Sequence, residues 1–120
     1  MAVVKLNLSG HENAKLAEQG FLFPGALHVD LADPELPNKV NDFLSPLVSS
    51  GDTVILALPG LAYLSAIVIA TIHGLSGHFP QIQALVRTDE GFVPNPLGPL
   101  GLQDFRNDVA RASRAGVVKL

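Results

Sequence analysis

The sequence contains no cysteine. This absence excludes a disulfide framework, a thiolate metal site and a cysteine nucleophile, and it is compatible with a reducing cytoplasm, where we expect the protein to act. Histidine is scarce as well, and the pair His73 and His78 has no nearby aspartate or glutamate to complete the four ligands of a zinc site. We therefore expect neither a metal nor another cofactor.

Positive charge is in short supply. Eight lysines and arginines stand against eleven aspartates and glutamates, which gives a formal net charge of −3. This balance argues against a partner made of long nucleic acid, but a small nucleotide held by backbone amides stays compatible with it. The chain also lacks a Walker loop, a Gly-x-Gly-x-x-Gly fingerprint and a Gly-x-Ser-x-Gly elbow. Nucleoside triphosphates, dinucleotide cofactors and α/β-hydrolase chemistry are therefore not indicated.

Long hydrophobic runs are absent except for Val54 to Leu75, which is about long enough to cross a bilayer. Pro59 and Gly60 divide this run, and no cluster of lysine or arginine flanks it. We therefore expect a buried strand followed by a buried helix, and no membrane partner. Because the N-terminus leads directly into the strand-like segment Val3 to Leu8, we expect no signal peptide.

What remains is the composition of one globular domain, residues 1–120, with 48% apolar and 16% charged residues. We predict strands at Val3 to Leu8, Ala26 to Leu31, Thr53 to Leu58 and Gln81 to Arg87. We predict helices from the turn at Ser9 to Gly20, and at Asn38 to Val48, Leu61 to His73 and Leu102 to Arg114. The last of these is amphipathic, with Leu102, Phe105 and Val109 expected to face inward. Thr88 to Gly101 reads as a proline-rich surface loop, and Val117 to Leu120 as a further edge strand.

This alternation of strands and helices with short connections predicts an α/β fold, a Rossmann-like three-layer domain. We expect a mainly parallel sheet of four to five strands in the order 2-1-3-4. In that order the chain reverses direction between strands 1 and 3, and ligands bind in the crevice at such a reversal.

Two strand-to-helix junctions, Leu8 to Glu12 and Leu58 to Tyr63, follow those two strands. Free backbone N–H groups at the start of a helix point toward the carboxyl edge of a parallel sheet and bind anions there. Because both junctions lie at the same edge, they predict one site for a phosphate-bearing ligand.

The first junction offers the Ser9 hydroxyl, close backbone approach at Gly10, and a ring nitrogen of His11 for hydrogen bonding or proton transfer. Each residue also has a plain structural explanation. Ser9 and Glu12 have the spacing of a capping box, and His11 at a helix start can simply be solvated.

The second junction offers Pro59 and Gly60, which alternatively serve only as a turn, and the single tyrosine, Tyr63. The tyrosine ring can stack on a nucleobase, or it can be a boundary residue with a hydroxyl in water. Arg87, at the end of the fourth predicted strand, can clamp a phosphate or pair with the adjacent Asp89 or Glu90.

The helix Leu61 to His73 is apolar almost all round. A helix of this kind is buried on more than one side, and a domain of this size covers the second side most readily with another copy. We therefore expect a homodimer that uses this helix.

Two motifs resemble a known family: Leu-Ser-Gly-His after the first strand, and Gly-Asp-x-Val-x-x-x-Leu-Pro-Gly-x-Ala-Tyr from Gly51 to Tyr63. They resemble small CRISPR-associated proteins of type III systems that recognise cyclic oligoadenylates, a group that includes the compact ring nucleases. The similarity runs from Val3 to about Val93. It implies a dimer that holds the cyclic nucleotide across its two-fold axis. The implied ligand shell is Ser9, Gly10, His11, Pro59, Gly60, Leu61 and Tyr63, and the argument from the sheet edge adds Arg87.

We therefore expect a protein that binds cyclic tetra-adenylate and damps type III CRISPR signalling by sequestration. The first alternative is a metal-independent ring nuclease that uses His11 or Arg87. Ring cleavage needs a ribose hydroxyl in line with the phosphate and a cation for the developing charge, and neither junction contains lysine or arginine. The second alternative is an α/β regulatory module that binds no nucleotide.

Overall fold

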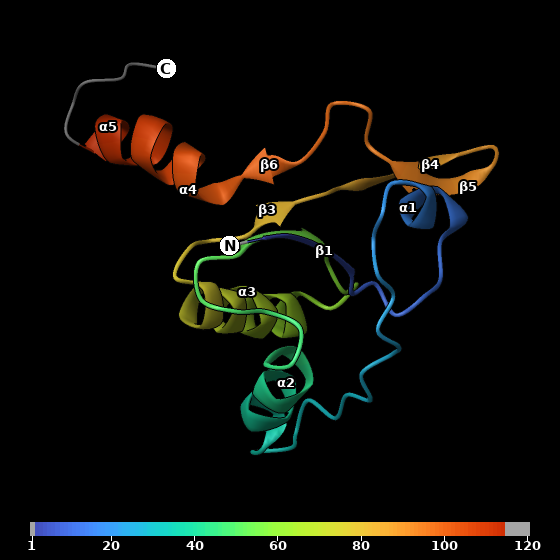
Figure 1. The fold of residues 1–120 in the computed structure, drawn as a ribbon, viewed down its shortest axis with the longest axis horizontal. Coiled ribbons are helices and arrows are strands. Elements are labelled where there is room, and N and C mark those ends of the chain that lie inside the picture. The colour runs from blue at the N-terminus through green and yellow to red at the C-terminus, as the bar shows by residue number, and fades with distance from the viewer. Residues whose placement is uncertain (1, 115–120) are drawn as a thin grey trace.

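Two parallel strands form the centre of the structure, a computed structural model that describes residues 2–114. β1 (Val3–Asn7) and β2 (Thr53–Ala57) pair in register over their whole five-residue length. β3 (Gln81–Ile82) extends the sheet in parallel, and β6 (Leu100–Gly101) adds an antiparallel edge, giving the order β1-β2-β3-β6 (Figure 1). The predicted α/β class with a mainly parallel sheet is confirmed. The predicted strand Val117 to Leu120 lies outside the described residues.

Helices and an antiparallel hairpin cover the two faces of this sheet. The helices are α1 (Ala14–Glu18), α2 (Leu36–Leu44) and α3 (Ala62–Ser76), followed by a continuous C-terminal helical segment of α4 (Leu102–Phe105), the π-helical η1 (Arg106–Ala110) and α5 (Arg111–Arg114). The hairpin is β4 (Leu85–Thr88) with β5 (Gly91–Pro94). In Figure 1, α2 and α3 lie on one side of the sheet, and α1 with the hairpin lies toward the other.

Alternation along the strands sends side chains to both faces. Leu6, Val54 and Leu56 pack in one core cluster with the buried residues of α2 and α3. On the opposite face, Ala57 packs with Leu16 of α1 and Phe21. Fully burying a leucine or valine side chain contributes about 1.5–3 kcal/mol, so the larger cluster holds most of the stability.

The predicted second strand, Ala26 to Leu31, is wrong. Only Leu22 pairs with β1: its N–H donates to the carbonyl of Lys5 at 2.9 Å, and its carbonyl accepts from the N–H of Asn7 at 2.8 Å. Pro24 then follows without an N–H, and Gly25 has a φ of 103°. These two residues turn the chain away from β1 before a strand forms, so the order 2-1-3-4 is not seen.

The predicted strand Gln81 to Arg87 is divided at Gln83. Gln83 is buried, and its side-chain amide donates to the carbonyl of Ala84 at 2.9 Å. The chain beyond it pairs with β5 instead of with β2, and Gly91, with a φ of 96°, permits the tight reversal after Thr88. Much of the predicted loop Thr88 to Gly101 is therefore regular structure, because it supplies β5 and β6.

The C-terminal segment forms the predicted helix, and of the three residues expected to face inward Leu102 and Val109 are half-buried, whereas Phe105 is 49% exposed. The segment contacts β3 and β6 through α4 and projects beyond the sheet (Figure 1). The radius of gyration is 15.3 Å, larger than the value of about 13.6 Å expected for a compact domain of this length.

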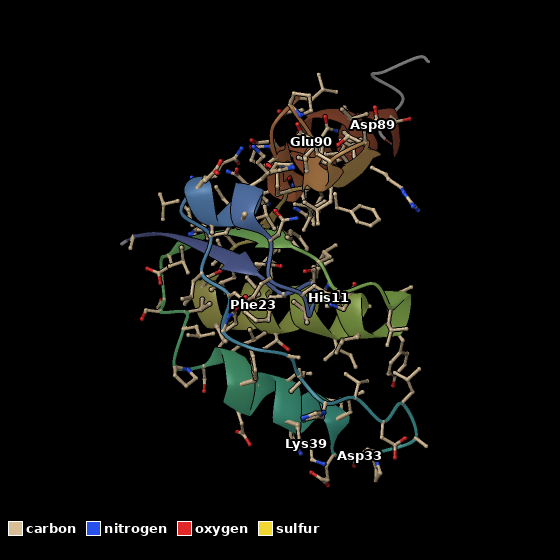
Figure 2. The ribbon with its side chains drawn as sticks, turned by 90° about the vertical axis from the view of Figure 1, so that its right-hand side faces the viewer. His11, Phe23, Asp33, Lys39, Asp89 and Glu90 are labelled. Carbon is tan, nitrogen blue, oxygen red and sulfur yellow. The ribbon has the colours of Figure 1, made fainter. Side chains whose placement is uncertain are left out.

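α2 forms within the predicted helix Asn38 to Val48 and packs its apolar side against the larger core cluster. Val40 and Leu44 are buried and Phe43 is half-buried, and Leu47, in the turn that follows α2, is half-buried against the same cluster. The loop before the helix is held by Asp33, whose carboxylate accepts from the Lys39 ammonium and from the N–H of Glu35. The hydrogen bond from Lys39 keeps the pKa of Asp33 below its usual range. In Figure 2 this pair marks the end of α2 far from the hairpin.

α3 buries Leu64, Val68 and Ile72 along one side and ends at Gly77, whose φ is 90°. Its exposed Gly74 has open space where a Cβ would be placed. Within residues 2–114, none of the helices combines the length and the hydropathy that crossing a membrane requires.

Replacement by alanine is expected to change the free energy of unfolding in opposite directions at Gly74 and Gly77. Gly74→Ala raises the free energy of unfolding by about 0.5–1 kcal/mol, because alanine loses less backbone entropy in a helix. Gly77→Ala lowers it by roughly 1–2 kcal/mol, because a side chain is strained in the left-handed conformation. Urea unfolding of both variants measures the difference, and shifts of the same sign would contradict the assigned end of α3.

Candidate functional site

The two strand-to-helix junctions lie side by side at the carboxyl edge of the sheet. Asn7 and Ala57, the last residues of β1 and β2, are partners in the register. The N–H of Leu8 donates to the carbonyl of Ala57 at 2.9 Å and carries the pairing one residue further. The predicted convergence of the two junctions is therefore present in the structure.

Two hollows flank the meeting point of the junctions. One, here called the apolar cavity, has a volume of about 250 Å³ and lies on the side of α2 and α3. The other, here called the polar cleft, has a volume of about 810 Å³ and lies between the first junction, α1 and the hairpin. Ser9, Gly60 and Leu61 line both hollows, and we call these three residues the rim.

The apolar cavity is built from three parts of the chain. It is lined by Val40, Phe43 and Leu44 of α2, by Leu64 and Val68 of α3, and by Leu27 and Val29 of the segment between α1 and α2. Leu8, Gly10, Gly25 and Pro59 complete the lining together with the rim. None of these described lining residues is charged.

The polar cleft has a different chemistry. His11 and Lys15 line it as possible cations, and Glu12 and Glu90 line it as anions. In Figure 2 the turn that carries Asp89 and Glu90 lies above His11, so the hairpin forms the roof of the cleft. Lys15 was not predicted from the sequence as a site residue; it lies in the first turn of α1, which the turn at Ser9 to Glu12 brings to the same cleft.

Asn7 organises the first junction, and the sequence analysis did not identify it. Its side chain is 1% exposed. Its Oδ1 accepts from the N–H of Ser9 at 3.1 Å and from the Ser9 hydroxyl at 2.6 Å, and its Nδ2 donates to the carbonyl of His11 at 2.9 Å. A polar residue at the end of an otherwise apolar strand is the signal that points to such a role.

The predicted capping box of Ser9 and Glu12 is wrong. α1 begins at Ala14, and its N-cap is Asn13, whose side chain accepts from the N–H of Leu16 at 3.0 Å. Asn7 holds Ser9 in the turn instead, and Gly10 adopts a φ of 87° that favours glycine. Ser9, His11 and Glu12 consequently line the polar cleft rather than being wound into the helix.

The second junction leaves its backbone open. The Ser65 hydroxyl donates to the carbonyl of Pro59 at 3.0 Å and fixes the turn. In the described part of the chain, the N–H groups from Gly60 to Leu64 have no hydrogen-bond partner, and Leu61 provides no side-chain cap. A Cβ at Gly60 would meet nothing within 4 Å, so a ligand can approach this backbone closely.

Two predicted site residues lie elsewhere. Tyr63 is 57% exposed on α3 and lines neither hollow. Arg87 is exposed on β4 opposite Phe92 and lines neither hollow, because β4 belongs to the hairpin and not to the parallel sheet. Among the residues that the structure describes, it forms no ion pair with Asp89 or Glu90.

The described residues contain no group of three histidine, aspartate or glutamate side chains placed to hold a metal ion. Comparison with protein-family models, with curated proteins and with solved structures finds no significant match. The geometry of the rim and of its two hollows therefore carries the functional argument.

Removal of the Asn7 amide tests its role in the junction. Asn7→Leu lowers the free energy of unfolding by about 2–4 kcal/mol, because three hydrogen bonds are lost at about 1 kcal/mol each. It also speeds amide hydrogen exchange at Ser9. Asn41→Leu, at an exposed position on α2, is the matched control and changes stability by less than about 0.5 kcal/mol. Equal stability of the two variants would show that Asn7 does not hold the turn.

Proposed function

We propose that this chain binds a cyclic oligoadenylate, cyclic tetra-adenylate in particular, across a homodimer and sequesters this messenger of type III CRISPR signalling in the cytoplasm. The observation that carries the proposal is the convergence of the two junctions at one rim. There, the backbone that follows β1 and the backbone that follows β2 both face two hollows with different lining residues. In open α/β sheets, this edge is the place where ligands bind.

The rim suits a phosphate. Within residues 2–114 the N–H groups from Gly60 to Leu64 have no partner, and α3 is fifteen residues long, so its dipole adds favourable potential at this end. Gly60 and Gly10 carry no side chain to keep a phosphate away from the backbone. Recognition by amides explains how a chain with a net charge of −3 would hold an anion.

The outer side of α3 supports the dimer. Tyr63, Ala66 and Ala70 are exposed along it, and the two alanines allow a second helix to approach closely. A two-fold dimer presents each junction twice, which matches a ring with its own internal two-fold symmetry. Tyr63, on this face, would then lie between the protomers.

The residues that line the polar cleft bear on whether a bound ring is only sequestered or is also cleaved. A ring nuclease is favoured by one observation, because His11 and Lys15 line the cleft together and can serve as proton acceptor and cation. Glu12 and Glu90 line the same cleft and oppose the charge that develops on a cleaved phosphate. Because of this repulsion, we propose binding rather than catalysis as the function.

One mixture of labelled cyclic tetra-adenylate and protein, without metal, distinguishes the possibilities. A native gel reports binding, and a denaturing gel over hours reports cleavage. A shifted, intact ligand supports sequestration. Linear di-adenylate beyond protein equivalents supports the ring nuclease, in which case His11→Ala and Lys15→Ala each slow turnover by about 10²-fold or more. If neither binding nor cleavage is seen, the chain is an α/β module without a nucleotide ligand.

Substitution at the rim tests the placement of the site. Gly60→Leu fills the space above the amides and abolishes the shift, while thermal unfolding stays close to that of the native chain because the added side chain meets no neighbour. Gly74→Leu, at an equally open glycine near the other end of α3, is the control and keeps full binding. Normal binding by Gly60→Leu would remove the rim from the site.

A further inference from the structure

The size of the apolar cavity limits what can occupy it. Its volume is about 250 Å³. An engineered cavity of about 150 Å³ holds benzene, and sites for drug-sized ligands begin at about 300 Å³. The cavity is therefore large enough for one flat group of one or two rings, and too small for a complete nucleotide.

The walls of the cavity suit an aromatic group. Leucine and valine side chains form most of the lining, and the half-buried ring of Phe43 supplies the one aromatic surface among the described lining residues. Aromatic rings favour stacked or edge-to-face neighbours at such a surface. Leucine and valine side chains offer no hydrogen bonds to water, so a ring that enters displaces only weakly held water from these walls.

The segment that turns away from β1 supplies backbone groups beside the cavity. Gly25, Leu27 and Val29 of this segment line the cavity. Within residues 2–114, no backbone N–H or carbonyl of residues 23–29 takes part in a hydrogen bond. A heteroaromatic ring with donors and acceptors along one edge can satisfy these groups, whereas a hydrocarbon cannot.

We propose that the apolar cavity is a base pocket, which holds one adenine of the bound cyclic oligoadenylate. This inference rests on the proposed function and adds selectivity for the base to it. The phosphate attached to that nucleotide then lies at the rim, which borders the cavity, and the neighbouring nucleotides lie in the polar cleft. The apolar and polar parts of a nucleotide thus fall on the two sides of the rim that match them.

A filled pocket tests this assignment. Leu27→Phe adds volume at the cavity wall from a half-buried position outside the sheet. We expect it to weaken binding of labelled cyclic tetra-adenylate by about tenfold or more, the range found when a base loses its stacking partner. Leu47→Phe is the matched control. Leu47 is a half-buried leucine that packs against the same core cluster but does not line the cavity. Its substitution changes affinity by no more than about twofold.

The wild-type chain provides a second measurement that does not depend on the folding of a variant. In methyl NMR spectra, addition of cyclic tetra-adenylate shifts the signals of Val40, Leu64 and Val68, which line the cavity, and leaves Leu16 on the opposite face unchanged. Cyclic tetra-uridylate, whose single-ring base fills less of the cavity, binds more weakly by about fivefold or more.

The outcomes separate the two proposals. If the wild-type chain does not retain cyclic tetra-adenylate, the proposed function fails, and the base pocket fails with it. If the wild-type chain binds but the cavity methyl signals do not move, the base assignment alone is overturned. Equal affinity of Leu27→Phe and the native chain overturns it in the same way. Weakened binding by Leu27→Phe with shifted cavity methyl signals supports both proposals.

Discussion

The rest of the structure depends on the in-register pairing of β1 with β2. Asp52 fixes its beginning, since its carboxylate accepts from the N–H of Ala2 at 3.1 Å and from the N–H of Ser49 at 2.8 Å. The bond from Leu8 to Ala57 fixes its end. Because neither strand overhangs the other, both junctions leave the sheet at the same level. A slip of one residue would turn Leu6 and Leu56 away from their core and separate the two halves of the rim.

The features near this pairing were predictable from the sequence, and those set by competing local signals were not. Apolar runs from Val3 and Thr53, joined by helical segments, specify parallel neighbours, and from them the meeting of the two junctions follows. By residue type, a helix can begin either at Ser9, with Glu12 completing a capping box, or at Asn13 as a single N-cap. The buried amide of Asn7 decides between them, and burial of a side chain is not visible in a sequence.

The remaining differences have a similar physical origin. The alternating pattern of Ala26 to Leu31 is typical of a strand, but its apolar side chains, Leu27 and Val29, line the cavity instead. A pattern records which side chains avoid water, and it does not record whether the backbone finds a partner strand. The same limit explains why Arg87 was predicted at the carboxyl edge of the parallel sheet. The predicted strand Gln81 to Arg87 is one unbroken run in the sequence, but the chain passes from one sheet to the other at Gln83.

The proposed recognition through backbone amides would have an electrostatic consequence for the proposed dimer. Amides contribute partial charges only, so a dimer with a formal charge of −6, twice the −3 of one chain, would keep that charge on taking up a ligand with four phosphates. The loaded particle would then be more acidic than either component, and the added repulsion would extend over about 10 Å at 0.1 M salt. Rising ionic strength would relieve this repulsion and favour loading, the reverse of the salt dependence of proteins that hold nucleic acid with lysine and arginine.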